Sequence, residues 1–186
     1  MKWFIIAIVA FVVIVALWAV SAYNSLVRLR NLVQEAWRQI DVELQRRHDL
    51  IPNLVETVKG YAKHEASTLE AVTQARTIAA APGSSPAEQA QQENVLTQAL
   101  GRLFAVAEAY PDLKANQNFI QLQQELTNTE DRIAAGRRFY NANVRELNTR
   151  CETFPSAIIA NMFGFKRAEY FETEDAAARQ APTVQF

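Results

Sequence analysis

The sequence contains few of the residues on which several common classes of site depend. Of its 186 residues, one is cysteine, Cys151, and two are histidine, His48 and His64. A single cysteine excludes an internal disulfide framework and any Cys-x-x-Cys motif for metal or redox chemistry. Gln45 and Tyr61 stand three residues before the histidines, so neither histidine has the Glu-x-x-His spacing of a di-iron bundle. We therefore expect no metal and no cofactor.

Glycine is also scarce, and the charge is balanced. The five glycines stand singly, so the sequence has no glycine-rich phosphate loop. The formal net charge is −1, which gives no indication of a nucleic-acid partner. No segment alternates strictly between apolar and polar residues, which argues against β-strands. These absences predict an all-α protein that is not an enzyme.

One long apolar run dominates the N-terminal end. Residues 3–20 are apolar throughout, and continued to Tyr23 the run reaches the roughly 20 residues needed to cross ~30 Å of hydrocarbon. Trp3 near one end and Trp18 near the other suit the two aromatic interfaces of a membrane. A cleavable signal peptide is the alternative, but the run is longer than a usual signal core and no loop follows it. We predict a transmembrane anchor over residues 1–23.

Helical periodicity begins directly after this anchor, with no glycine or proline between. Apolar residues recur at intervals of three and four, the spacing of a seam that faces partner helices in a bundle or coiled coil. We predict that the transmembrane helix is continuous with a bundle of about four helices over residues 24–171, and that 172–186 form a disordered polar tail. Arg47 and Glu65 fall on the seam. We interpret them as long side chains that reach solvent at its edge, with buried ion pairing as the alternative.

Seven residues predict helix boundaries or interruptions: Asp49, Pro52, Asn53, Ser85, Glu88, Pro111 and Pro155. Ser85 followed three residues later by Glu88 is a capping box, so a helix should begin there and end at Pro111. The last long helix should run over residues 119–154, with Cys151 as a buried thiol on its seam, and Pro155 should stop or bend it. The apolar period continues across Asp49 to Asn53. A kink and a reversal of the chain therefore both remain open at Pro52, with Asp49 as the cap of a new helix.

Two groups of residues are candidates for contacts outside the bundle. Arg28, Arg30 and Arg38 follow the anchor and are placed to touch anionic headgroups, although a solvated helix face is an equal alternative. Their excess over Lys2 favours a cytoplasmic position for the soluble part, with a periplasmic or extracellular position as the alternative.

The second group is an apolar segment near the C-terminal end: Ile158, Ile159, Met162, Phe163, Phe165, Tyr170 and Phe171. Packing over the open end of the bundle is one interpretation of this segment. A contact with the membrane surface or another subunit is the other, because so apolar a patch is unfavourable in water.

Several motifs together resemble the LemA family. They include residues 46–55 (RRHDLIPNLV), 60–65 (GYAKHE), 103–116 (LFAVAEAYPDLKAN) and 163–165 (FGF). The resemblance covers about residues 1–172 and implies a single-pass protein of the bacterial inner membrane with a long antiparallel helical bundle. It implies no enzyme and no cofactor, and a magnetosome-forming relative suggests membrane shaping or scaffolding at the level of the family.

These observations predict a membrane-anchored helical scaffold whose partners are the lipid bilayer and further copies of the same chain. The alternative is an adaptor that binds another membrane protein, such as an envelope-stress protease.

Overall fold

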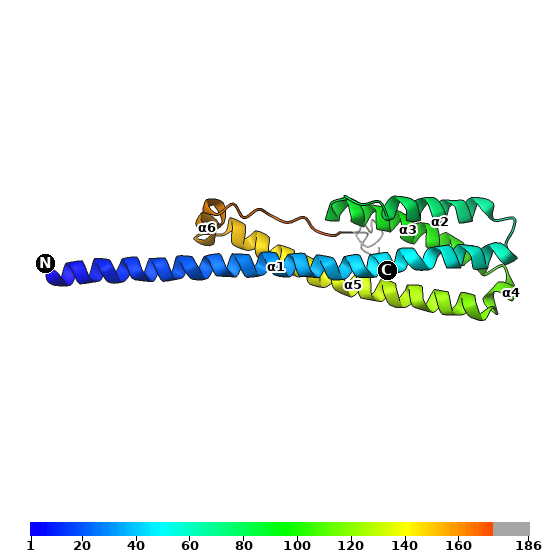
Figure 1. Cartoon of the computed structure of the whole chain (residues 1–186), viewed down its shortest axis with the longest axis horizontal. Coiled ribbons are helices and arrows are strands. Elements are labelled where there is room, and N and C mark those ends of the chain that lie inside the picture. Colours follow the sequence, from blue (N-terminus) through cyan, green and yellow to red (C-terminus); the bar gives the residue numbers. More distant parts are fainter. Residues whose placement is uncertain (173–186) are drawn as a thin grey trace, which may run out of the picture. The chain divides into compact units, whose positions relative to one another are not determined.

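The computed structural model describes residues 1–172, so the predicted polar tail lies, from residue 173 on, outside the described residues. Within the described range every regular element is a helix, which confirms the predicted all-α fold. The helices are α1 (Lys2–Tyr61), α2 (Ala66–Ala79), α3 (Pro86–Ala107), α4 (Pro111–Lys114), α5 (Gln117–Glu152) and α6 (Ser156–Met162) (Figure 1).

The chain forms two compact units. The first comprises Met1–Gln39 and Arg138–Glu169, and the second comprises Ile40–Arg137 with residues 170–172. The two longest helices, α1 and α5, contribute residues to both units.

The second unit has a helical core built mainly from apolar residues that recur at intervals of three and four. Apart from Phe171, which follows α6, its largest fully buried side chains come from α1, α2, α3 and α4: Ile40, Leu44, Ile51, Leu54, Val58, Val72, Leu96, Leu103 and Leu113. The spacing of three and four places these residues on one face of each helix, and burying that face supplies most of the stability of such a bundle. The side chain of Ser85 accepts a hydrogen bond from the N–H of Glu88 at 3.4 Å, and the Glu88 carboxylate accepts one from the N–H of Ser85 at 2.9 Å. This capping box begins α3.

Of the two alternatives at Pro52, a kink and a reversal of the chain, the reversal is wrong. Pro52 lies inside α1, so the chain does not reverse there, and the first break in the helix comes only after Tyr61. Asp49 caps nothing, because it lies within the helix and accepts a hydrogen bond from the side chain of Gln45 at 2.8 Å. Asn53 is exposed, and its carbonyl oxygen accepts the hydroxyl of Thr57 at 2.8 Å. A proline removes only one helical donor, and the continued helix buries the apolar residues that follow.

The other proline boundaries fall close to their predicted positions. Helix α3 ends at Ala107, before the predicted end, and Pro111 is the first residue of the short α4. Proline at a first helical position is well tolerated because its missing N–H has no partner there. Helix α5 ends at Glu152, and Pro155 is the residue that precedes α6.

The first unit pairs α1 with the C-terminal part of α5. Its core includes Leu26, Val33, Val144 and Leu147, each no more than 7% exposed. After α6 the chain continues without regular structure and is fixed to α5. The Asn148 side chain donates to the carbonyl of Ala168 at 3.0 Å and accepts from its N–H at 2.9 Å. The Tyr140 hydroxyl donates to the carbonyl of Glu169 at 2.8 Å. These bonds hold the segment after α6 against the helix.

Candidate functional site

The apolar N-terminal run is the most exposed hydrophobic surface of the first unit. Residues 3–18 include thirteen large or medium apolar side chains that are at least 38% exposed, among them Phe4, Phe11 and Leu17. In the part of the chain that the structure describes, α1 is the helix long and apolar enough to cross a membrane. Apolar side chains exposed along a whole helix are covered by lipid when that helix spans a bilayer.

The three arginines that follow the anchor have different environments. The Arg30 guanidinium lies over the ring of Phe165, 5.2 Å from its centroid, in a cation–π contact. Arg38 pairs with Glu35 at 3.8 Å and lies fifteen residues beyond Tyr23, about 22 Å along the helix. This is beyond a headgroup layer of about 5–8 Å. Arg28 has no ion pair among the described residues and stands on the exposed side of α1.

The structure divides the apolar C-terminal segment into inward-facing and outward-facing residues. Ile159 and Phe171 are buried, at 5% and 1% exposure, so the packing interpretation describes them. Phe165 and Tyr170 are half-buried. The outward-facing residues are Ile158, Met162 and Phe163, at 50%, 69% and 56% exposure.

Phe154 belongs with these outward-facing residues. It was expected as the last residue of the helix over residues 119–154. Helix α5 ends at Glu152 instead, and Phe154 is 79% exposed. We call Phe154, Ile158, Met162 and Phe163 the α6 patch. Its four large apolar side chains are open to solvent in the described structure.

The α6 patch is held beside the end of the anchor. The ring of Tyr23 lies 4.7 Å from that of Phe163 and 5.8 Å from that of Phe165, measured between centroids. Gly164 between them has φ +69°, a left-handed conformation that glycine adopts without strain and that lets the chain turn at this point. Leu17 of the apolar run and Phe154 of the α6 patch line one cavity, so the patch lies beside the apolar run.

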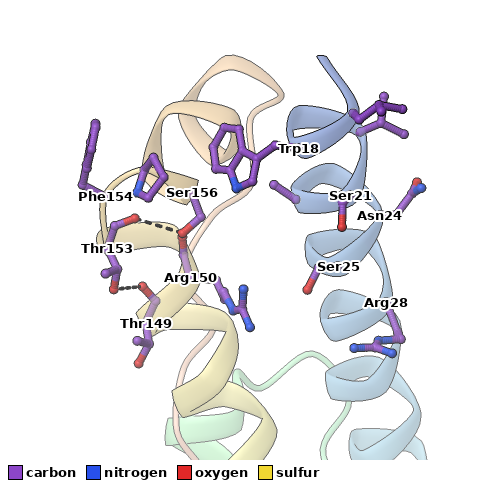
Figure 2. Close-up of a pocket in the computed structure, with 14 residues that line it drawn as sticks. Trp18, Ser21, Asn24, Ser25, Arg28, Thr149, Arg150, Thr153, Phe154 and Ser156 are labelled. Atoms are coloured by element: carbon purple, nitrogen blue, oxygen red, sulfur yellow. Dashed lines mark hydrogen bonds between the residues drawn. The ribbon is translucent and has the colours of Figure 1, made fainter. Parts of the chain in front are cut away.

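A cleft of about 870 Å³ separates the end of the anchor from the junction of α5 and α6. One wall is α1 from Leu17 to Arg28, and the other is the segment from Thr149 to Ser156. Figure 2 shows Arg150 extending from α5 towards α1, with Arg28 and Ser25 on the opposite wall and Trp18 at the upper rim. No aspartate or glutamate is among the lining residues. The cleft is therefore cationic where it approaches the soluble part and apolar where it meets the anchor.

A buried polar cluster lies in the second unit, and it corrects our interpretation of Arg47. Arg47 is 3% exposed and does not reach solvent. Its guanidinium pairs with Glu93 at 3.3 Å and with Glu130 at 3.2 Å, and it donates to the hydroxyl of Thr97 at 2.6 Å. These three partners explain its burial, because a paired and hydrogen-bonded charge can be removed from water at tolerable cost.

Glu93 completes this cluster. It is 3% exposed, and its second oxygen lies 2.7 Å from His48 Nε2 and accepts the amide of Gln89 at 2.9 Å. Sequence reasoning missed Glu93 and His48. The spacing could have revealed Glu93, because it lies three residues before Leu96 on the buried face of α3. A negative charge on this face is the counterpart of the positive charge of Arg47 on the seam of α1.

The metal-ligating side chains and the thiol of Cys151 are the remaining reactive groups in the described range. No group of three or more His, Cys, Asp or Glu side chains there is arranged to hold a metal ion. Cys151 is partly buried rather than fully buried, because the seam ends beside it. Burial, with a smaller effect of Glu152, raises the pKa of its thiol and so disfavours the reactive thiolate.

Comparisons with known proteins cover most of the chain. The sequence model of the LemA family matches residues 36–186. Magnetosome protein MamQ 2 of Paramagnetospirillum magneticum is 28% identical over 97% of this chain and 74% of its own length. Magnetosome protein MamQ of Magnetospirillum gryphiswaldense is 28% identical over 88% of this chain and 69% of its own. Protein LemA of Metamycoplasma hominis is 29% identical over 84% of this chain and 71% of its own. None of these names is that of an enzyme.

Proposed function

Because the chain belongs to the LemA family, we propose that it is a non-catalytic scaffold that contacts the bacterial inner membrane at two places and assembles there with further copies of itself. The coarser description, a membrane-associated helical protein, follows from the apolar helix and the relatives. The finer description depends mainly on one observation, the position of the α6 patch beside the end of the anchor.

The patch supports a second contact with the bilayer. Its side chains are 50–79% exposed, and Phe163 packs on Tyr23, the last residue of the predicted anchor. Burying an apolar side chain of this size is worth about 1.5–3 kcal/mol when it is complete, so partial insertion of four of them is favourable. The anchor would bring the patch to the interface without further cost in translational freedom.

The names of the relatives support a role in organising membranes, by analogy only. Two of the relatives are magnetosome proteins. Their similarity extends over most of this chain, including its helical units. A protein that inserts both a spanning helix and an interfacial segment at one face of the bilayer occupies more area in that leaflet. Many copies side by side would therefore favour curvature or fix the shape of the membrane.

A groove in the second unit supports self-assembly. Ile78 of α2 and Val95 of α3 are 48% and 55% exposed and border a cavity of about 320 Å³. Ala71, Ala75 and Ala99 line it, and such small side chains let another helix approach closely. Anchored copies share one plane, which raises their effective concentration for one another. A second copy of the chain is therefore the partner that we propose for this groove.

The mass of the intact chain in native nanodiscs tests self-assembly. We expect a multiple of the 21.0 kDa chain mass, and a monomer from Ile78→Lys/Val95→Lys. Thr73→Lys/Thr77→Lys adds the same charge to exposed positions of α2 that do not line the groove, and it should keep the multiple. A monomeric unmodified chain would contradict self-assembly and favour the adaptor that binds another membrane protein.

A spin label at Met162 tests the second membrane contact. The label is attached to Cys151→Ser/Met162→Cys, with Cys151→Ser/Thr77→Cys as the matched exposed position on α2. In nanodiscs, we expect the label at position 162 to be relaxed by oxygen, which concentrates in lipid, and the label at position 77 by a water-soluble nickel chelate. Equal nickel accessibility at both positions would show that the α6 patch stays in water.

The charge distribution next to the anchor supports a cytoplasmic soluble part. Arg28 and Arg30 follow the span closely, whereas Lys2 is the only basic side chain before it. Alkaline phosphatase fused after residue 186 is active only outside the cytoplasm, so we expect an inactive fusion. An active fusion would place the soluble part on the other side.

A further inference from the structure

We propose that the cleft beside the end of the anchor binds the phosphate-bearing headgroup of an anionic phospholipid, with Arg28 and Arg150 as its cationic contacts. The inference requires the membrane anchor but not self-assembly. It concerns the 870 Å³ cavity between α1 and the junction of α5 and α6, all of it within the first unit.

The donors of the cleft suit a phosphate. Arg28 has no carboxylate partner in the described structure, and Arg150 uses only its Nε atom, which donates to Glu146 at 3.1 Å. The terminal nitrogens of Arg150 therefore remain available. Guanidinium groups bind phosphate oxygens through paired, charge-assisted hydrogen bonds. Since no carboxylate lines the cleft, a bound anion meets no negative side chain there.

Several hydroxyl groups add neutral donors to these charges. Those of Ser21, Ser25 and Thr149 line the cleft and have no hydrogen-bond partner among residues 1–172. The hydroxyls of Thr153 and Ser156, by contrast, are bonded to backbone carbonyls of α5 at 2.6–2.9 Å. The unpartnered hydroxyls of Ser21 and Ser25 therefore lie on the α1 wall of the cleft, the wall that also carries Arg28.

The distance of the cleft from the end of the anchor matches the depth of the headgroup layer. This favours a lipid headgroup over a soluble anion as the ligand. Arg28 follows Tyr23 by five residues, about 8 Å along the helix, which is within reach of the headgroup layer. Leu17, Trp18 and Val20 line the other end of the cleft, where acyl chains would lie.

Native mass spectrometry of the full chain tests the proposal. The chain is released from nanodiscs that contain phosphatidylcholine with phosphatidylglycerol as the minor lipid, and the retained lipids are counted. We expect a preference for phosphatidylglycerol that falls about thirtyfold in Arg28→Gln/Arg150→Gln, since each arginine near the surface contributes about 1 kcal/mol. Both side chains are exposed, so the variant should fold normally.

The control is Arg38→Gln/Arg145→Gln, which removes the same charge from exposed positions on the same two helices outside the cleft. It should keep the preference. An equal loss in both variants, or no preference in the unmodified chain, would overturn the proposal. Glycerol 3-phosphate added at the same concentration as a short-chain phosphatidylglycerol should not displace the lipid. If it competes equally, the cleft is a site for soluble phosphate compounds and the lipid assignment is wrong.

The same variants separate this inference from self-assembly. If Arg28→Gln/Arg150→Gln loses the lipid preference and keeps the oligomeric mass, the cleft binds lipid independently of assembly. If the unmodified chain is monomeric and still retains phosphatidylglycerol, the lipid site stands and self-assembly fails.

Discussion

Arg76 of α2 donates its Nε–H to the carbonyl oxygen of His48 in α1 at a distance of 3.2 Å. That carbonyl is four residues before Pro52, so it is the one whose helical partner the proline removes. The hydrogen bond from Arg76 replaces the missing backbone donor. It explains how α1 continues through Pro52 with this acceptor satisfied, and it ties α2 to α1 within the second unit.

We predict that Arg76→Met destabilises the second unit by about 1–3 kcal/mol, because it leaves a partly buried carbonyl without a donor. Pro52→Ala restores the backbone N–H, so the same Arg76 substitution should cost less in that background. Thermal unfolding of the four full-length chains in detergent, followed by helical circular dichroism, measures this double-mutant cycle. An equal cost of Arg76→Met in both backgrounds would show that the two residues are not coupled.

Breaking the buried cluster should have a larger effect. Glu93→Leu removes the buried carboxylate that Arg47 and His48 share. It leaves the buried Arg47 with the half-exposed Glu130 as its remaining carboxylate, so the cost should approach that of a broken buried pair, about 3–5 kcal/mol. Arg47→Met in the same chain removes the buried positive charge, so the double variant should be more stable than Glu93→Leu alone. The measurement is the midpoint of thermal unfolding.

The neighbouring ion pair provides the control for this prediction. Arg46 and Glu125 are 3.8 Å apart, with side chains 49% and 38% exposed. Surface pairs of this kind are worth about 0–1 kcal/mol, so Arg46→Gln should shift the midpoint little. If Arg46→Gln costs as much as Glu93→Leu, burial is not what makes the cluster important.

The sequence was sufficient for the helical fold because apolar spacing is a local property of the chain. The seam from Phe119 to Leu147 and the capping box at Ser85 are both visible in the residues themselves. The region of Pro52 was not predictable in this way. The donor that replaces its missing N–H comes from Arg76, twenty-eight residues from His48, and only the packing of α2 on α1 brings it there.

The candidate site was predictable only in part. The arginines after the anchor and the apolar C-terminal segment were recognisable by composition, but their division into paired, buried and exposed members was not. Arg30 is paired with the ring of Phe165 because the turn at Gly164 returns the chain to α1. Nothing in the sequence marked Arg150 as a candidate site residue, because it lines the cleft only through the antiparallel pairing of α5 with α1.

Tyr140 should make stability depend on alkaline pH. Burial, with a smaller effect of Glu169, raises the pKa of its hydroxyl from 10.0 to about 12. The folded chain therefore holds this proton more tightly than the unfolded chain. Its contribution is constant below pH 10, and stability falls between pH 10 and about 12, by about 3 kcal/mol in total.

Tyr140→Phe should remove this part of the pH dependence. At neutral pH the variant should lose about 1 kcal/mol, because the carbonyl of Glu169 loses its hydroxyl donor. Urea unfolding at about pH 8 and about pH 11 provides the comparison. Tyr110, whose pKa is also raised by burial and by Glu65, leaves a residual slope of the same sign. A variant whose stability falls with pH as steeply as that of the unmodified chain would contradict the assignment to Tyr140.

Two helical glycines should respond to alanine in different ways. A Cβ atom at Gly101 would meet nothing within 4 Å, whereas one at Gly136 would lie 3.1 Å from Cγ1 of the buried Ile40. Gly101→Ala should therefore stabilise the chain by about 0.5–1 kcal/mol through helix propensity alone. Gly136→Ala gains the same propensity but must displace Ile40 in a close-packed core, so its net effect should be smaller or destabilising.

Removing the neighbour tests whether this contact is the cause. In an Ile40→Ala background the space beside Gly136 is open, and Gly136→Ala should become stabilising there. Gly101→Ala should have the same effect in both backgrounds, because it is not in contact with Ile40. Thermal midpoints of the single and double variants give the coupling. If Gly136→Ala has the same effect with and without Ile40, the close approach of α5 to α1 at this position is not what requires a glycine.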